Sequence, residues 1–317
     1  MFWIAVCLIA GATMLYFGSD WLVRGAKGLA LRLGVSPFII GLTIVAFGSS
    51  APECITSIVS TSAPSLIIGN VVGSNIANVG LAIGLAAIAG PMAAVYKSMR
   101  LEICAMLAAV AGLCVLAFTV PIGRYVGIGL IALLFLFLYI VFTKKKTDEE
   151  GRAAYEEEVS EETLGTPVLS LLVVVGLVLL YFGAKYFIMG AKDLAADLGV
   201  SEMLIGLIVV AIGTSLPEMC ISVMAARRNE ADLAVANIVG SNIFNILFVL
   251  GIGATLVDIP VSESMMWFHM PVMLLFSVVM FLLVRQKNRI GRPAGLLLVC
   301  MYAAYIAIMG FVPSLMI

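Results

Sequence analysis

Two short motifs place carboxylates inside very apolar parts of the chain. The sequence GSSAPE occupies residues 48–53 and GTSLPE occupies residues 213–218, so Glu53 and Glu218 each follow directly on a proline. The basic residue nearest to Glu218 along the chain is Arg227. An ionised carboxylate at the centre of a bilayer costs at least about 2.5 kcal/mol on insertion scales. Each glutamate therefore needs a counter-charge, which a proton or a bound cation can supply.

Oxygen-bearing residues accompany both glutamates at helical spacing. If residues 37–60 and 202–225 are helices, positions i, i+3, i+4 and i+7 share one face. In the first helix this face carries Ala46, Ser49, Ser50 and Glu53, and in the second it carries Ala211, Thr214, Ser215 and Glu218. The next spans have a polar residue at every fourth position, namely Asn70, Ser74 and Asn78, and Asn237, Ser241 and Asn245. Four helices are thus expected to carry narrow polar stripes.

Proline adds backbone oxygens to these side chains. Pro52 has no N–H to donate to the carbonyl of Gly48, and Pro217 has none for Gly213, so each loosens its helix and frees carbonyl groups. Carboxylates, hydroxyls, amides and carbonyls are hard oxygen donors, which suit Ca²⁺ and Na⁺ and do not suit soft metals. The pattern predicts a site where Glu53 and a second glutamate share a hard cation.

The polar residues also have a purely structural interpretation. Each glutamate could be protonated and could hydrogen-bond Ser or Asn, holding helices together. Small and polar residues commonly pack membrane helices, and this interpretation applies equally to Asn70, Asn75, Asn237 and Asn242. Two glutamates at equivalent places on hydroxyl-rich stripes favour the cation site.

The elements that must position these residues are membrane helices. Hydrophobic residues make up 62% of the 317 residues and charged residues 12%, which is about half the charge of a soluble domain. A spanning helix needs about 20 apolar residues, and the chain offers ten such stretches: 2–23, 37–60, 66–90, 99–119, 122–143, 166–188, 202–225, 232–257, 266–284 and 293–314. We predict an all-α polytopic membrane protein with ten transmembrane helices. Of its 19 carboxylates, only those of Glu53 and Glu218 are expected to lie deep.

Lys and Arg are distributed unequally between the two sides of these spans. If the polar segment 144–166 is cytoplasmic, all 18 Lys and Arg residues except Arg124, Lys185 and Lys192 lie on the cytoplasmic side. Because basic residues concentrate in cytoplasmic loops, we predict this orientation in the plasma (inner) membrane, with both termini outside. Segment 144–166 is then a solvated linker. His269, near the outer end of its span and beside Trp267, is predicted to be interfacial.

The chain repeats itself along its length. Three pairs of segments match, with offsets of 165, 165 and 167 residues: 16–36 with 181–201, 41–60 with 206–225, and 69–79 with 236–246. The chain is therefore predicted to consist of two homologous halves of five spans each. An odd number of spans inverts the second half relative to the first. Inverted repeats with a site between them are a transporter architecture.

The predicted domains follow from the repeat. Residues 1–143 form the first five-helix repeat, with its motif region at 37–90, and residues 167–317 form the second, with its motif region at 202–257. The linker 144–166 joins the two repeats on the cytoplasmic side.

The doubled motif resembles the two α-repeats of the sodium/calcium exchangers, of the bacterial type, in the cation/calcium antiporter superfamily. GSSAPE and GTSLPE are each followed by GSNIxN, at residues 73–78 and 240–245, and the resemblance covers essentially the whole chain. Proton/calcium exchangers of this superfamily carry a different acidic motif, typically GNxxE. The resemblance implies alternating access in which the first and sixth helices, matched by residues 16–18 and 181–183, slide over the rest.

The resemblance also implies a set of metal ligands. In the family the two motif glutamates coordinate Ca²⁺ and help to bind Na⁺, together with nearby hydroxyls, amides and the carbonyls of two alanines. The matching positions are Glu53, Glu218, Ser49, Ser50, Thr214, Ser215, Ala46, Ala211, Ser74, Ser241, Asn78 and Asn245. Many relatives, including potassium-dependent ones, have Asp at the position of Asn245. Asparagine there argues against potassium coupling and leaves two carboxylates at the site.

The function that the resemblance implies is exchange of Na⁺ for Ca²⁺, with Ca²⁺ extrusion as the expected direction. A proton- or potassium-coupled cation antiporter of the same superfamily is the alternative. A channel fits inverted halves containing prolines less well, and an intramembrane hydrolase would need a nucleophile and base or a motif such as HExxH. We therefore predict a non-enzyme without a cofactor. The expected partners are Ca²⁺, Na⁺ and the lipid bilayer, with no nucleic acid and no obligatory protein partner.

Overall fold

Helices make up nearly all of the structure. The computed structural model describes residues 1–90, 92–93, 96–145, 164–199, 213–287, 289–312 and 315. Within these ranges, nine helical stretches are long and apolar enough to cross a membrane. They correspond to nine of the ten predicted spans. The remaining predicted span, 202–225, begins outside the described ranges, and its second half forms α13 (Leu216–Arg227).

The first helix of each half is longer than its predicted span. Helix α1 covers Phe2–Leu33 and α10 covers Thr166–Asp197, 32 residues each, whereas hydropathy predicted 2–23 and 166–188. Hydropathy marks only the part of a helix that the hydrocarbon covers, and charged residues such as Arg24 and Lys27 continue a helix well. Helix α1 ends at Gly34, whose φ of 66° is the left-handed conformation that glycine provides at helix C-termini.

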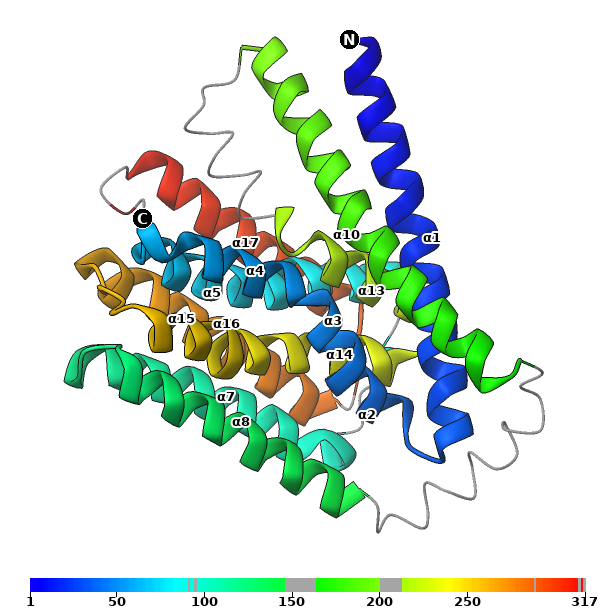
Figure 1. Cartoon of the computed structure of the whole chain (residues 1–317), viewed down its shortest axis with the longest axis horizontal. Coiled ribbons are helices and arrows are strands. Elements are labelled where there is room, and N and C mark those ends of the chain that lie inside the picture. Colours follow the sequence, from blue (N-terminus) through cyan, green and yellow to red (C-terminus); the bar gives the residue numbers. More distant parts are fainter. Residues whose placement is uncertain are drawn as a thin grey trace.

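Glycines spaced seven residues apart hold α1 and α10 together, namely Gly11, Gly18 and Gly25, and their repeat equivalents Gly176, Gly183 and Gly190. A Cβ atom on Gly176 would lie 2.8 Å from the carbonyl oxygen of Gly18, so the backbones are in close contact. Gly11 faces Phe187 near one end of the pair, and Gly25 faces Leu169 near the other. The two helices are therefore antiparallel, which agrees with inverted halves. They run side by side along one edge of the molecule (Figure 1), and α1 packs against the bundle at α13 and α2.

The first motif span is broken and is not one helix. It runs as α2 (Pro37–Ile40), the π-helical η1 (Gly41–Val45), α3 (Ala46–Ser49), α4 (Ala51–Val59) and the short η2 (Ser60–Ser62). Ser50 has left the helix, with φ −85° and ψ 4°, and its repeat equivalent Ser215 has φ −91° and ψ 5°. Pro52 and Pro217 occupy the first turn of the helix that follows, where the missing N–H has no cost. The prolines thus begin new helices, whereas the sequence predicted continuous, loosened ones.

The third span of each half follows a common plan. It consists of α5 (Ser65–Ala77), η3 (Asn78–Ile83) and α6 (Gly84–Ala89) in the first half, and of α14 (Ala231–Phe244), η5 (Asn245–Val249) and α15 (Leu250–Leu256) in the second. Both π-helical segments begin at the last asparagine of GSNIxN, Asn78 or Asn245. Such π-bulges are frequent at functional sites.

The last two spans of each half complete the bundle. They are α7 (Tyr96–Thr119) and α8 (Arg124–Lys145), then η6 (Met265–His269) with α16 (Met270–Lys287), and α17 (Arg292–Phe311). Two short antiparallel pairings tie the halves together: β1 (Met92–Ala93) with β2 (Arg289–Ile290), and the single bridge between Ile122 and Ile259. Each pairing joins the loop between the third and fourth spans of one half to the loop between the fourth and fifth spans of the other half, so the two pairings are equivalent under the repeat.

His269, predicted from the sequence to lie at the membrane interface, is enclosed by protein at the start of its span. Its side chain is fully buried, with Nδ1 2.9 Å from the Tyr305 hydroxyl and Nε2 2.6 Å from the Leu315 carbonyl oxygen. Trp267 is the exposed member of the pair, at 72%. Residues two apart on a helix point in different directions, so only one of them can face the lipid.

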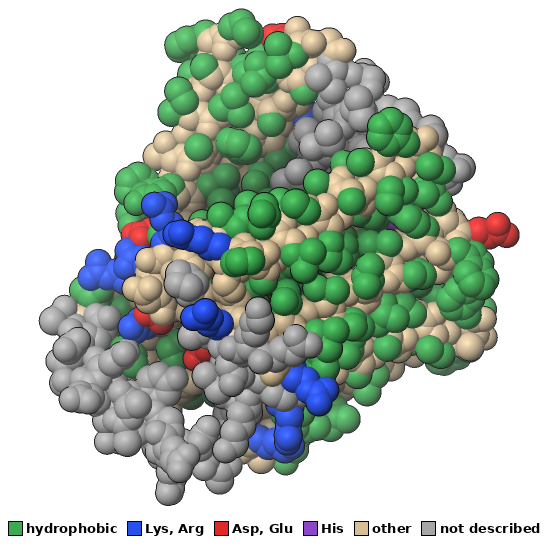
Figure 2. All heavy atoms as spheres, turned by 180° about the vertical axis from the view of Figure 1, so that it is seen from behind, with side chains coloured by type: hydrophobic (Ala, Val, Ile, Leu, Met, Phe, Trp, Pro, Cys, Tyr) green, Lys and Arg blue, Asp and Glu red, His purple; other side chains and the backbone are tan. Residues whose placement is uncertain are grey.

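The outer surface suits a bilayer. Hydrophobic side chains cover most of the face seen in Figure 2, and the Lys and Arg side chains gather toward one end. Large hydrophobic side chains are also exposed on α8 and α10, among them Phe135, Tyr139 and Val174. So continuous an apolar surface matches lipid and not water.

Candidate cation-binding site

Each motif glutamate lies in the first turn of a helix that starts at the break. Glu53 belongs to the first turn of α4, and Glu218 belongs to the first turn of α13. Backbone N–H groups at a helix start lack helical partners, and the helix dipole is positive there, so a carboxylate is favoured at this place. The motif G-x-S-x-P-E thus positions its glutamate by ending one helix and starting the next.

The two glutamates are buried between the halves of the protein. Their side chains are 1% (Glu53) and 0% (Glu218) exposed. Oε1 of Glu218 accepts a hydrogen bond from Ser50 Oγ at 3.5 Å. Oε2 of Glu218 and both carboxylate oxygens of Glu53 are buried without a hydrogen-bond donor within the described part of the chain. Buried acceptors without donors require an explanation, and a bound cation provides one.

Hydroxyl groups join the two repeats around these glutamates. Ser49 Oγ lies 3.4 Å from Ser241 Oγ, and the repeat-equivalent pair, Thr214 Oγ1 and Ser74 Oγ, lies 3.3 Å apart. Ser49 Oγ also lies 3.3 Å from the carbonyl oxygen of Ala46. Each pair combines the motif span of one half with the third span of the other. The four polar stripes predicted from the sequence therefore face one another.

The remaining predicted ligands have different surroundings. Asn78 donates a hydrogen bond from Nδ2 to Asn242 Oδ1 at 3.0 Å. Ser215 Oγ and both amide atoms of Asn245 are buried and have no partner among the residues that the structure describes. Ala211 lies outside the described residues.

Asn237 lies at the candidate site, although the sequence did not distinguish a packing role from a functional role for it. Its Oδ1 accepts from Ser49 Oγ at 3.5 Å, and its Nδ2 donates to the carbonyl oxygen of Glu218 at 3.4 Å and to Ser222 Oγ at 3.1 Å. The signal that could have identified it is its place four residues before Ser241, on the same polar stripe. Asn237 is a link between the two motif spans and α14.

A third carboxylate, that of Glu102, is buried inside the protein. Glu102, one turn into α7, is 0% exposed. Helix α7 packs against α14 and α16, so a side chain near the end of a span can be enclosed by neighbouring helices without lying deep in the membrane.

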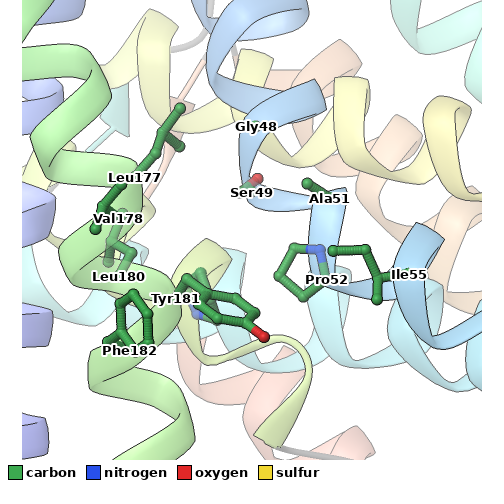
Figure 3. A pocket seen from close by; sticks show the side chains of 11 residues that line it. Gly48, Ser49, Ala51, Pro52, Ile55, Leu177, Val178, Leu180, Tyr181 and Phe182 are labelled. Carbon is green, nitrogen blue, oxygen red and sulfur yellow. The ribbon is translucent and has the colours of Figure 1, made fainter.

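A cavity of about 320 Å³ adjoins the site (Figure 3). Gly48, Ser49, Ala51, Pro52 and Ile55 line one wall, with Pro217; Leu177, Val178, Leu180, Tyr181 and Phe182 of α10 line the other. The ring of Tyr181 extends from α10 toward the wall that Pro52 forms. A displacement of α10 relative to α3 and α4 would therefore change access to Ser49.

The architecture and the site together define a class of protein. An all-helical membrane protein with two inverted halves and a buried, oxygen-lined site between them is an ion transporter in plan. In the described ranges no cluster of three or more His, Cys, Asp or Glu residues is present. A cation at this site would be held by two carboxylates and otherwise by uncharged oxygens.

Comparison with known proteins identifies the family. The chain belongs to the sodium/calcium exchanger protein family, whose profile matches residues 3–143 and 168–311. It is 35% identical to an uncharacterised membrane protein of Methanocaldococcus jannaschii, over 94% of this chain and 95% of that one. It is 32% identical to the sodium/calcium exchanger MaX1 of Methanosarcina acetivorans, over 96% and 98%. Among solved structures, the sodium-calcium exchanger NCX_Mj superposes with a TM-score of 0.84 at 32% identity, over 96% of this chain and 98% of that one.

Proposed function

We propose that this protein carries Na⁺ and Ca²⁺ in opposite directions across the membrane and that both ions use Glu53 and Glu218. Its membership of the sodium/calcium exchanger family supports the exchange. The proposed site rests on three buried carboxylate oxygens that have no donor among the described residues, namely Oε1 and Oε2 of Glu53 and Oε2 of Glu218. Paired carboxylates among hydroxyls and amides are ligands that Ca²⁺ and Na⁺ prefer.

Further ligands surround these carboxylates in the proposal. They are Ser49, Ser50, Ser74, Thr214, Ser215, Ser241, Asn78 and Asn245, with the backbone oxygens of Ala46 and Ala211. The contacts of Ser49 with Ser241 and of Ser74 with Thr214 support a site that needs both halves. A site shared between halves that move relative to each other is exposed to one side of the membrane at a time.

Transport of Na⁺ and Ca²⁺ is coupled because both ions need the same two carboxylates. Ca²⁺ and a full complement of Na⁺ cannot occupy the same two carboxylates together, so one displaces the other. Without a bound cation, two ionised glutamates make the site costly to carry through the low-dielectric barrier. Uncoupled return is therefore slow. With an inward Na⁺ gradient, the expected result is Ca²⁺ extrusion.

Reconstitution into liposomes tests the proposal. The purified protein should take up ⁴⁵Ca²⁺ when the vesicles are loaded with Na⁺ and diluted into Na⁺-free medium, and it should not do so when K⁺ replaces Na⁺ inside. Glu53→Gln and Glu218→Gln keep the side-chain shape and remove the charge, so each should abolish uptake while leaving a folded protein. Glu263→Gln changes an exposed glutamate and is the matched control. Exchange at the parental rate in a folded variant of Glu53 or Glu218 would contradict the proposed site.

A further inference from the structure

The polar contacts around the site are unequal in the two halves, although the residues that make them are equivalent. Ser50 Oγ donates to Glu218, whereas its counterpart Ser215 Oγ and the oxygens of Glu53 have no partner among the described residues. The hydroxyl pairs of Ser49 with Ser241 and of Thr214 with Ser74, by contrast, are both formed.

The asparagine stripes show the same inequality. Asn78 donates to Asn242 at 3.0 Å, whereas the equivalent donor Asn245 and the side-chain acceptor of Asn75 are both unpaired within the described structure. Equivalent residues therefore form one set of hydrogen bonds and leave the matching set unformed.

The inequality is clearest in a group formed by Asn237, Ser222 and the backbone carbonyl of Glu218, in which neither the asparagine nor the serine side chain is a proposed ligand. In the second half, Asn237 Nδ2 donates to Ser222 Oγ at 3.1 Å and to the backbone carbonyl of Glu218 at 3.4 Å. The equivalents in the first half are Asn70 and Ser57. Asn70 Nδ2 and Ser57 Oγ are both buried, and neither has a hydrogen-bond partner among the described residues.

The packing of α1 and α10 also differs between the two halves. The cavity lies beside Gly48, Ser49 and Pro52, in the half whose Asn70 and Ser57 are unpaired. Against the other half, α1 packs along α13, where the bonds are made. The unpaired group thus stands on the side where the α1–α10 pair leaves space.

We infer that the group Asn237–Ser222–Glu218 and its equivalent Asn70–Ser57–Glu53 are alternating locks, of which one is closed in each facing state of the transporter. Alternating access in inverted-repeat transporters comes from movement of one repeat or bundle against the other around a fixed site. In this inference, the two equivalent groups exchange their hydrogen-bonded arrangements during that movement. In the structure described here the lock of the second half is closed, which means that the hydrogen bonds of Asn237 to Ser222 and to the Glu218 carbonyl are formed. In the opposite-facing state, Asn70 donates to Ser57 and to the Glu53 carbonyl, and Asn237 releases its partners.

Asn70 and Asn237 are therefore positioning residues for transport, because they set the balance between the two facing states. Removing a lock weakens only the state in which it is closed. A state with a smaller population requires more cation for half-saturation, in inverse proportion to its population. The ratio of half-saturating Ca²⁺ concentrations on the two sides consequently measures this balance. The inference rests on exchange by alternating access at the site proposed above.

The experiment compares Asn70→Ala and Asn237→Ala in vesicles of defined orientation. Half-saturating Ca²⁺ is measured from each side by Ca²⁺/Ca²⁺ exchange. Loss of one or two buried hydrogen bonds should change the ratio of half-saturating Ca²⁺ concentrations roughly two- to tenfold. The change should have opposite directions in the two variants. The double variant should return the ratio to the parental value. Ser277→Ala removes a buried hydroxyl that bonds only within its own helix, to Met273 at 2.9 Å, and should leave the ratio unchanged.

Equal shifts in the same direction, or no shift in either variant, would overturn the inference. A uniform loss of affinity on both sides would show that the asparagines serve the ions directly, while the exchange itself and the role of Glu53 stand. If an alanine variant does not fold, Ser57→Ala and Ser222→Ala make the same comparison with a smaller change. A cysteine at Ala51, in the cavity wall, gives a second readout. In a cysteine-free background, Asn70→Ala and Asn237→Ala should change the labelling rate of this cysteine in opposite directions.

Discussion

At the scale of single residues, the site depends on charge. Glu53 and Glu218 are enclosed and have few hydrogen-bond donors, so a cation and a proton compete for the same oxygens. Hydroxyls and amides complete the coordination without adding charge. The chemistry of the site is therefore set by how many carboxylates it contains and by what neutralises them.

Acidic pH should inhibit the exchange. Protonation of either glutamate removes part of the charge that Ca²⁺ requires, so the half-saturating Ca²⁺ concentration should rise as the pH is lowered. The measurement is ⁴⁵Ca²⁺ uptake into proteoliposomes at a fixed Na⁺ gradient and varied pH. An affinity for Ca²⁺ that is independent of pH, in a range where Glu53 binds protons, would contradict competition at the site.

Asn245→Asp should change the ion dependence of transport. Asn245 is fully buried, and neither of its amide atoms has a partner within the described part of the chain, so an aspartate there adds a third carboxylate with nothing to neutralise it. A further proton or a K⁺ ion is then needed. We expect the variant to become more sensitive to pH or to acquire a dependence on K⁺. Profiles for pH and K⁺ that match those of the parent would place Asn245 outside the site.

At the scale of helices, the α1–α10 pair behaves as one unit because its glycines bring the two backbones together. Within the described ranges, α1 packs against α13 and α2, and α10 contacts α13 and α3. Two ion pairs also join α1 to the segment after α13: Asp20 with Arg228, and Lys27 with Glu230 at 2.8 Å. The sequence did not predict these pairs because the partners are about 200 residues apart.

Gly176→Ala should destabilise the protein. The added methyl group would lie 2.8 Å from the Gly18 carbonyl oxygen, which forces the helices apart at a cost of about 1–3 kcal/mol. The matched control is Gly112→Ala, because a Cβ atom there meets nothing within 4 Å. Thermal unfolding of the purified proteins in detergent should show a lower midpoint for Gly176→Ala only. Similar midpoints for the two variants would show that the glycine contact is not tight.

The ion pair between Asp20 and Arg228 should contribute measurably to the attachment of α1. Their side chains are 22% and 41% exposed, so a double-mutant cycle with Asp20→Asn and Arg228→Gln should give a coupling energy of about 1 kcal/mol or less. The charge reversal Asp20→Arg with Arg228→Asp should recover part of the loss seen in either reversal alone. Additive effects of the two neutralising substitutions would mean that the pair has no energetic role.

At the scale of the whole molecule, the distribution of basic side chains indicates how the protein is inserted. Lys and Arg gather toward one end (Figure 2), and this end is expected to face the cytoplasm. In a cysteine-free background, a cysteine at Gly165 should resist impermeant thiol reagents in intact cells and react in inverted vesicles. A cysteine at Glu263, exposed in a loop predicted to be outside, should show the reverse. Labelling of Gly165→Cys from outside would overturn the orientation.

Much of this protein could be inferred from the sequence because its main signals are local. Apolar runs give the membrane helices, and the matching segments at offsets of 165 and 167 residues give two inverted halves. Glu53 and Glu218 can be identified as candidate site residues because a carboxylate in an apolar run has no local partner. The spacing of Ser74 and Asn78 places oxygens on one helical face. Each of these inferences uses only helical geometry and the cost of burying charge.

The tertiary structure decided what depends on packing between distant segments. Hydropathy could not reveal the full length of α1, the close contact of Gly18 with Gly176, or the burial of Glu102 and His269, because neighbouring helices cause them. The sequence shows Asn70 and Asn237 as equivalents. In the folded protein the amide of Asn237 bonds to Glu218 and Ser222, whereas Nδ2 of Asn70 has no partner among the described residues. Which of two equivalent groups forms its hydrogen bonds depends on how distant helices pack around it, and a repeat in the sequence cannot show that.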